Sequence, residues 1–212
     1  MLKIWGRVTS VNVQKVLWAA DEIGLAYERI DAGGPFGKLD TPEYLALNPN
    51  QKIPVIQDDE FVLWESNAII RYLSEAYGVL APVGLQARSL AGQWCDWSLS
   101  TLYNDLVGIC FHQHVRVTAQ ERDHLAVAEA AARLVPSFMI LNDHLEGRSF
   151  LVGNSLSFAD IAVGALLYRY YTMPIEHAKA PHVEAWYQRL QERPAYREHV
   201  MRDWHQMKIA GA

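Results

Sequence analysis

Residues 51–67 read QKIPVIQDDEFVLWESN, and this stretch decides the fold. Two short runs in it, 53–57 and 61–64, are rich in branched and aromatic side chains and are predicted to be strands. The turn Asp58-Asp59-Glu60 between them is short, which favours an antiparallel hairpin. A helical pattern follows over residues 66–77.

The segments before this hairpin alternate between strand-like and helix-like patterns. Residues 2–5 are a short apolar run, and residues 12–22 repeat apolar side chains at helical spacing. Residues 27–30 are predicted to form a second strand. Thr41-Pro42-Glu43 is typical of a helix start, with a capping threonine and proline in the first turn. This βαβαββα order predicts a thioredoxin-like α/β domain over residues 1–78.

Only helical periodicity appears in the rest of the chain, so the fold class is predicted to be α/β plus all-α. A linker is expected over residues 79–86, followed by an all-helical domain over residues 87–212. Its first long helix is expected over 90–111, where large apolar residues are frequent. Another helix is expected over 181–193, because Pro194 follows.

Two capping boxes indicate where the intervening helices begin. Thr118-Ala119-Gln120-Glu121 is predicted to open a helix that runs to about Leu145, with a kink at Pro136. Ser157-Phe158-Ala159-Asp160 is predicted to open a helix over 161–170. That helix is apolar on nearly every face, which is typical of the buried centre of a bundle.

Composition excludes several classes of function. The chain has 212 residues, a formal net charge of −5 and no run of Lys and Arg, so nucleic acid is not expected as a partner. The first residues contain no continuous apolar segment of the signal-peptide kind. No apolar stretch reaches the roughly 20 residues that span a bilayer. We therefore expect a cytoplasmic protein without a membrane partner.

Few side chains outside the hairpin region indicate chemistry. Cys95 and Cys110 lack the spacing of a metal site or a redox motif and are expected to be buried free thiols. His112 and His114 are two apart and cannot share a helical face, so they do not predict a metal pair. Asp160 is expected to be the partner of a helix cap. No metal is expected.

Four segments in this order resemble the cytosolic glutathione transferases over nearly the whole chain. The N-terminal half contains Asn48-Pro49-Asn50-Gln51-Lys52-Ile53-Pro54-Val55 and Glu65-Ser66-Asn67-Ala68-Ile69. The C-terminal half contains Ser157-Phe158-Ala159-Asp160-Ile161-Ala162, and Trp186 followed by Arg193-Pro194-Ala195-Tyr196. The resemblance implies an enzyme that binds reduced glutathione as a co-substrate.

The hairpin and the following helix could hold a tripeptide with two carboxylates. Pro54 has no N–H, so the sheet ladder breaks there, and a cis bond would turn the Ile53 main chain toward an extended ligand. The resemblance implies this docking, with Pro54 cis. It also places the γ-glutamyl carboxylate on Ser66, a candidate N-cap, with Glu65 near the ammonium group. Lys52 is a candidate for the glycyl carboxylate.

Lys38 is a weaker candidate for that second carboxylate. Plain structural roles remain open for these residues: a solvated lysine, a capping serine and an edge-strand proline.

The turn between the first strand and the first helix is the candidate for activating the glutathione thiol. A free thiol of this kind has a pKa of about 8.5, and the thiolate is the nucleophile. No Tyr or Cys occurs between Met1 and Ile23, which disfavours the tyrosine and cysteine classes of the family. The sequence Thr9-Ser10-Val11-Asn12 is closest to the bacterial, nu- or theta-like subgroup with Thr-Pro-Asn at this turn.

We therefore expect Ser10 and Asn12 to donate hydrogen bonds to the sulfur, with Thr9 beside glutathione. The alternative is that Ser10 or Asn12 only caps the first helix.

The acceptor is expected to bind between the two domains, with Tyr103 and Phe111 as candidate lining residues. Two other functions remain open. A glutathione-dependent disulfide reductase or peroxidase would use the same fold, and a non-catalytic glutathione-transferase-like module would use it without chemistry. The resemblance also implies a homodimer, with the N-terminal domain of one chain on the helical domain of the other.

Overall fold

The N-terminal part of the computed structural model, which describes all 212 residues, is a four-stranded mixed sheet. Its strands are β1 (Leu2–Trp5), β2 (Tyr27–Ile30), β3 (Val55–Asp58) and β4 (Phe61–Trp64), arranged in the order β2-β1-β3-β4. β1 runs parallel to β2, and β3 runs antiparallel to both β1 and β4. The predicted βαβαββα fold is confirmed.

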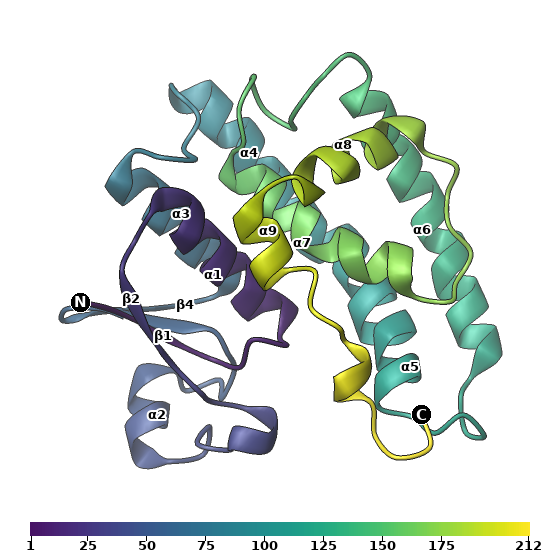
Figure 1. The fold of residues 1–212 in the computed structure, drawn as a ribbon, viewed down its shortest axis with the longest axis horizontal. Coiled ribbons are helices and arrows are strands. Elements are labelled where there is room, and N and C mark those ends of the chain that lie inside the picture. The colour runs from purple at the N-terminus through teal and green to yellow at the C-terminus, as the bar shows by residue number, and fades with distance from the viewer.

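Helices cover both faces of this sheet (Figure 1). α1 (Val11–Ile23) and α3 (Ser66–Tyr77) lie on one face, and α2 (Pro42–Leu47) with the 3₁₀ turn η1 (Gly34–Phe36) lies on the other. Gly24 ends α1 in the left-handed conformation, with a φ of 80° that glycine adopts without strain. Thr41 caps α2 as predicted, because its Oγ1 accepts from the Tyr44 N–H at 3.3 Å.

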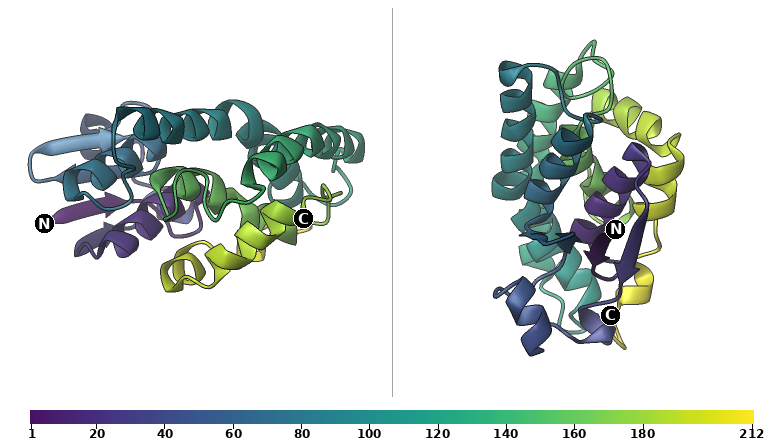
Figure 2. Two further views of the ribbon diagram at one scale, coloured as in Figure 1. Left: turned by 90° about the horizontal axis from the view of Figure 1, so that it is seen from above. Right: turned by 90° about the vertical axis from the view of Figure 1, so that its left-hand side faces the viewer.

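The rest of the chain is helical, as predicted. α4 (Leu85–Trp97), the π-helical segment η2 (Ser98–Phe111) and α5 (His112–Val115) follow one another as a continuous rod. α6 (His124–Leu145) packs against η2, and α7 (Phe158–Thr172) passes through the centre. α8 (Pro181–Gln191), α9 (Pro194–His199) and the 3₁₀ turn η3 (His205–Met207) complete the domain. Figure 2 shows the sheet at one end of the molecule.

Helix α7 is buried along nearly its whole length, as its apolar composition predicted. Asp160 holds its start. The Oδ2 atom of Asp160 accepts from the N–H and the hydroxyl of Ser157, each at 2.9 Å, and Oδ1 accepts from the Leu151 N–H at 2.9 Å. Both carboxylate oxygens of Asp160 therefore accept hydrogen bonds from neighbouring residues of the chain, which is the structural role that the capping box indicated.

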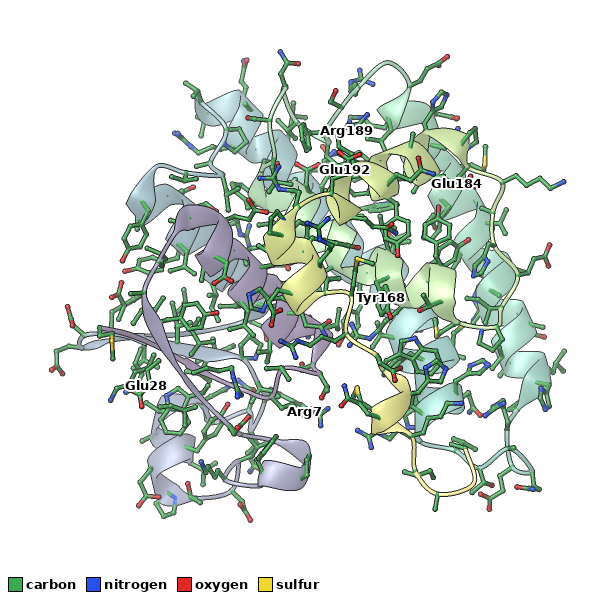
Figure 3. The ribbon with its side chains drawn as sticks, viewed as in Figure 1. Arg7, Glu28, Tyr168, Glu184, Arg189 and Glu192 are labelled. Atoms are coloured by element: carbon green, nitrogen blue, oxygen red, sulfur yellow. The ribbon has the colours of Figure 1, made fainter.

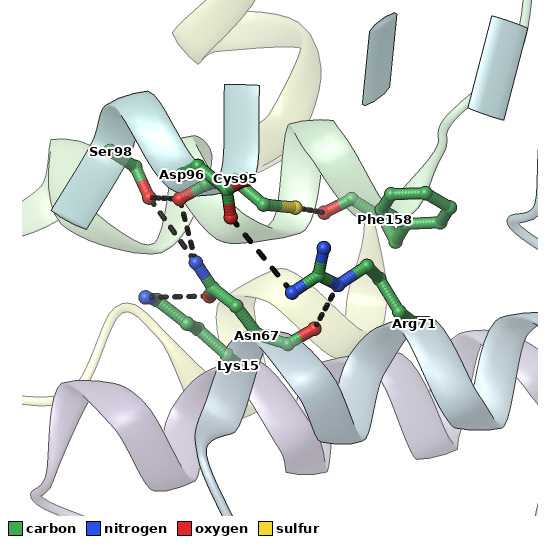
Figure 4. Close-up of polar contacts among 7 residues, drawn as sticks. All are labelled: Lys15, Asn67, Arg71, Cys95, Asp96, Ser98 and Phe158. Atoms are coloured by element: carbon green, nitrogen blue, oxygen red, sulfur yellow. Dashed lines mark hydrogen bonds and ion pairs between the residues drawn. The ribbon is translucent and has the colours of Figure 1, made fainter. Parts of the chain in front are cut away.

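One hydrophobic core runs through both parts of the chain. Trp18 on α1 packs edge to face with Tyr196 on α9, with ring centroids 4.8 Å apart. A set of hydrogen bonds, here called the joint, also connects the two parts through Lys15, Asn67 and Cys95 (Figure 4). Asn67 on α3 accepts from Lys15 Nζ at 3.1 Å and donates to the main-chain carbonyl of Cys95 on α4 at 2.8 Å. The two parts are therefore packed as one unit.

Three predicted boundaries are wrong. The helix expected to open at Thr118 begins at His124, because the Asp123 carboxylate caps it by accepting from the Ala126 N–H at 2.9 Å. The Thr118 hydroxyl donates instead to the Glu121 side chain at 2.8 Å. The helix expected over 181–193 ends at Gln191, and Pro194, expected only to stop it, begins a further helix. The first long helix begins at Leu85, inside the stretch expected to be a linker.

One strand differs from expectation. Of the run 53–57 only residues 55–57 pair in the sheet, so Ile53 and Pro54 lie before the strand. Helix α6 contains Pro136 and ends at Leu145, where the sequence predicted its end. By length and composition α6 is the one helix long and apolar enough to cross a membrane, and its buried stripe packs against η2 and α8 as a core helix does.

Candidate active site

A polar cavity of about 310 Å³ opens between the loops at one end of the sheet and the helix η2. It brings together segments that are far apart in the sequence: the turn after β1, the loops before α2 and β3, the start of α3 and one side chain of η2. Its lining residues are Arg7, Ser10, Asn12, Gly33, Gly34, Leu39, Asn48, Gln51, Lys52, Ile53, Pro54, Glu65, Ser66 and Tyr103.

The loop before β3 is fixed from α2. The Lys52 carbonyl accepts from the Tyr44 hydroxyl at 2.7 Å and from Asn48 Nδ2 at 2.9 Å. The following Ile53–Pro54 peptide bond is cis, as the family resemblance implied. Because Ile53 makes no ladder pair and lines the cavity, its main chain is available to an extended ligand.

The start of α3 forms the opposite wall. Glu65 is the N-cap, and its φ of 73° is uncommon for a residue with a side chain. Ser66 was expected to be the cap and is instead the first helical residue, with its side chain buried. The first N–H groups of a helix have no intrahelical partner, so this wall presents main-chain donors and a hydroxyl to an anion.

Three hydrogen-bonding side chains converge at the floor of the cavity. Ser10 precedes α1 without a capping side-chain bond, so its hydroxyl is not used by the helix. Asn12 Nδ2 donates to the Tyr103 hydroxyl oxygen at 3.2 Å, and Asn12 Oδ1 is buried without a partner. Burial raises the pKa of Tyr103, which keeps its proton at neutral pH. Tyr103 therefore has an O–H free to donate into the cavity.

A buried arginine from the second half of the chain supports this floor. Arg169 on α7 donates from Nη2 to the Thr9 carbonyl at 2.8 Å and from Nη1 to the Gln14 side-chain oxygen at 2.9 Å. Its guanidinium also lies over the Phe111 ring, 4.9 Å from the centroid. Burial lowers the pKa of Arg169 to about 10, so it remains a cation at neutral pH.

Because no carboxylate is hydrogen-bonded to Arg169, its charge favours a nearby anion such as a thiolate. Sequence reasoning missed Arg169 because it lies 160 positions from Thr9.

A second cavity of about 500 Å³ adjoins the first and shares Arg7 and Gly34 with it. Its other lining residues come from the turn after β1, from η1, and from the two chain segments that approach from the helical domain. They are Val8, Thr9, Pro35, Phe36, Arg116, Gln206 and Met207. In Figure 3 Arg7 lies between the sheet domain and the C-terminal segment that carries η3. The position of this cavity suits an acceptor.

Four predicted site residues lie elsewhere than expected. Lys38 lines neither cavity, and Thr9 lines the second rather than the first. Tyr103 was expected at the acceptor site and lines the first cavity instead. Phe111 is buried against Arg169 and Trp204 and lines neither cavity. Its place on η2 turns it into the core.

Comparison with known proteins identifies the family. Residues 1–75 match the model "Glutathione S-transferase, N-terminal domain", and residues 102–194 match "Glutathione S-transferase, C-terminal domain". The chain is 37% identical to glutathione S-transferase GstB of Escherichia coli over 208 residues, which covers 95% of this chain and 98% of that protein. It is 29% identical to glutathione S-transferase D6 of Drosophila melanogaster, covering 91% and 89% of the two chains.

A solved structure agrees with both. The theta class glutathione S-transferase of Xanthomonas axonopodis pv. citri with glutathione bound is 42% identical, covers 96% of this chain and 98% of its own, and superposes with a TM-score of 0.91. Fold and site thus define a two-domain transferase of the thioredoxin-like class. The chain belongs to the glutathione S-transferase family, as the resemblance implied, and the predicted enzyme class is confirmed.

Proposed function

We propose that this chain binds reduced glutathione in the first cavity, lowers the pKa of its thiol and lets the thiolate attack a small electrophile. The observation that carries the proposal is the convergence of Ser10, Asn12 and Tyr103 on one cavity whose other wall is the start of α3. The glutathione bound to the Xanthomonas relative supports the identity of the ligand.

The ligand's two ends find complementary groups in this arrangement. The γ-glutamyl carboxylate is assigned to the Ser66 hydroxyl and the free N–H groups of α3, and the ammonium group to Glu65. The main chain of Ile53 is assigned to the middle of the tripeptide, and Lys52 to the glycyl carboxylate. Residues 1–78 would supply these contacts and part of the acceptor wall. Beyond the linker 79–86, residues 87–212 would supply Tyr103 and the acceptor-wall residues Arg116, Gln206 and Met207.

The sulfur would lie over the floor of the cavity. Lowering its pKa by two units corresponds to about 2.7 kcal/mol of stabilisation of the thiolate. Hydrogen bonds to a charged group contribute about 1.5–3 kcal/mol each, so hydroxyl donors from Ser10 and Tyr103 are sufficient. Asn12 would orient the Tyr103 hydroxyl toward the sulfur and offer its second N–H. None of these groups acts as a base, and the thiol proton leaves to solvent.

The test is a titration of the bound thiol. Glutathione complexes of Ser10→Ala, Asn12→Ala and Tyr103→Phe are titrated against pH by thiolate absorbance. Each variant that removes a donor is expected to raise the thiol pKa by about one unit. Ser100→Ala removes an exposed hydroxyl of the same helix as Tyr103 and serves as the matched control. An unchanged thiol pKa in all three variants would refute the assignment.

Two assays separate the remaining functions. Conjugation of an aryl halide measured beside reduction of a small mixed disulfide distinguishes the transferase from the disulfide reductase. Calorimetry with glutathione distinguishes both from a non-catalytic module, since absence of binding would exclude every enzymatic use of the cavity.

The proposal includes a homodimer. β4 is an edge strand, and it exposes Phe61 and Trp64 to 46% and 38%, while the helical domain exposes Leu90 to 52% and Leu99 to 38%. Exposed apolar residues on both domains support the pairing of one chain's N-terminal domain with the other's helical domain. Light scattering of the purified chain tests this, and a monomer at assay concentration would contradict it.

A further inference from the structure

The charge of the second cavity distinguishes it from a simple apolar acceptor site. Val8, Pro35, Phe36 and Met207 contribute hydrocarbon to its walls. The charged side chains that line it are Arg7 and Arg116, and no Asp or Glu is among its lining residues. Two cations therefore face one cavity without an anion between them.

The Arg7 side chain packs against Gly34, and no acidic group neutralises its charge. Its Nε–H is buried and has no hydrogen-bond partner, and it forms no ion pair. Its Nη1 lies so close to Gly34 that a Cβ at position 34 would be 2.1 Å from it. Gly34 has a φ of 60° and leaves the room that the guanidinium occupies.

Arg116 approaches the same space from the helical domain. It follows α5 as the C-cap residue, and its side chain donates one hydrogen bond, from Nη1 to the Met207 carbonyl at 3.4 Å. Burial, and next the charge of Arg116, lower the pKa of Arg7, so the two guanidinium groups act on each other. Like charges that share a site are stabilised when an anion binds between them.

We propose that the acceptor carries an anionic group, a carboxylate or a similar oxyanion, which Arg7 and Arg116 bind in the second cavity. This inference rests on the proposed function. Arg7 also lines the first cavity, so an anion held there places the adjoining carbon skeleton toward the thiolate. The thiolate forms a C–S bond, the bond from carbon to the leaving group breaks, and the leaving group departs with its electron pair.

A matched pair of aryl halides tests the proposal. 4-Chloro-3-nitrobenzoate and 4-chloro-3-nitrobenzamide have the same ring and release the same chloride, but only the first is charged. Each kcat/KM is divided by the uncatalysed rate with glutathione, which corrects for the different reactivities of the rings. The protein is expected to favour the benzoate by roughly tenfold or more. Equal values, or preference for the benzamide, would overturn the proposal.

Arg116 gives the cleaner variant because it lines only the second cavity. Arg116→Gln is expected to lower kcat/KM for the benzoate by roughly tenfold, mainly through KM, and to lower kcat/KM for the benzamide much less. Arg116→Lys should retain part of the preference. Lys208→Gln removes the same charge one residue from Met207, outside the cavity, and should change neither substrate.

An equal loss for both substrates in Arg116→Gln would assign Arg116 a structural role and overturn the proposal. Binding of 3-nitrobenzoate and 3-nitrobenzamide to the glutathione complex, measured by calorimetry, repeats the comparison without chemistry. Turnover of the benzamide without preference for the benzoate would remove this inference alone. Failure to bind glutathione would instead remove the proposed function.

Discussion

Individual residues set the electrostatics of this site, and Arg169 is the clearest case. It is buried, it holds the Thr9 carbonyl beside Ser10, and its charge has no carboxylate partner. Arg169→Gln is expected to shift the pH dependence of kcat/KM upward by about half a unit to one unit, because the thiolate loses a neighbouring cation. Arg169→Lys keeps the charge and should shift it less.

The pH profile separates this electrostatic role from a structural one. A purely structural role would lower activity in both variants without moving the profile, and urea unfolding of each variant measures that loss directly.

Lys15 makes stability depend on pH in an unusual direction. Burial lowers its pKa to about 8, below the value of about 10.4 for an unfolded chain. Between these values the unfolded state binds the extra proton, so the free energy of unfolding rises with pH. In Lys15→Met this contribution is absent. The stability of Lys15→Met relative to the wild type is therefore expected to fall by about 1–2 kcal/mol from pH 7 to pH 9.5.

Urea unfolding of both proteins at each pH measures this difference. The contribution of the titrating tyrosines is the same in both proteins and cancels when the two free energies of unfolding are subtracted. A difference that stays constant over the range would show that Lys15 remains charged when buried.

Among the site residues, short local motifs were predictable, whereas Tyr103 was assigned to the acceptor site instead of the first cavity and Arg169 was not predicted. The residues of the Ile53-Pro54 and Glu65-Ser66 motifs line one cavity with Ser10 and Asn12, all within the first 66 positions. Arg7 lies in the same turn as Ser10, between β1 and α1. A basic residue beside the candidate thiol-activating residues was a signal in the sequence that could have identified it. Tyr103 and Arg169 arrive through the packing of η2 and α7, whose rotation about their axes periodicity leaves undetermined.

At the scale of elements, close packing of α7 sets a narrow limit on its residues. A Cβ added to Gly164 would lie 2.6 Å from Leu190 Cδ1 and 3.3 Å from Trp18 Cη2. Gly164→Ala is expected to lower the free energy of unfolding by about 1–3 kcal/mol, since α7 must shift to admit the methyl group. Denaturant unfolding with tryptophan fluorescence measures the change.

Gly92, inside α4, is the matched control. The nearest atom to its added Cβ is Arg71 Nη1 at 3.8 Å, an ordinary contact. Gly92→Ala should therefore raise stability by about 0.5–1 kcal/mol through helix propensity. Equal effects in the two variants would show that α7 is less tightly packed than the contacts at Gly164 require.

Element type was more predictable than element boundary. α1, β2, β4 and α3 agree with the predicted segments to within about one residue. Gly24 and Gly78 mark the ends of α1 and α3, and the acidic turn 58–60 marks the start of β4. The start of α6 was misplaced by a competing cap: both Thr118 and Asp123 could accept from a helix N–H, and the Asp123 carboxylate does so. The π-helical register of η2 has no signal in the apolar pattern.

At the scale of the whole molecule, the N-terminal sheet depends on the helical domain. α1 is buried between the sheet and the helices α7 and α9, and Trp18 is fully buried there. Residues 1–78 alone would expose that face, so the fragment is expected to remain unfolded and to bind no glutathione. Circular dichroism, amide NMR dispersion and calorimetry check this, with the full chain as the reference. A fragment with dispersed amide signals and a cooperative transition would contradict it.

The joint at Asn67 has a consequence for which positions can vary independently during evolution. Asn67 reaches the other half of the molecule through the carbonyl of Cys95, a main-chain group that any residue at position 95 would supply. This bond therefore does not depend on the side chain at 95, which is buried in the core and donates instead to the Phe158 carbonyl at 3.9 Å. Lys15 and Asn67 meet side chain to side chain, so a change in one demands a matching change in the other. Changes at this joint are therefore expected to be correlated between positions 15 and 67, both in the sheet half, and not with the side chain at position 95.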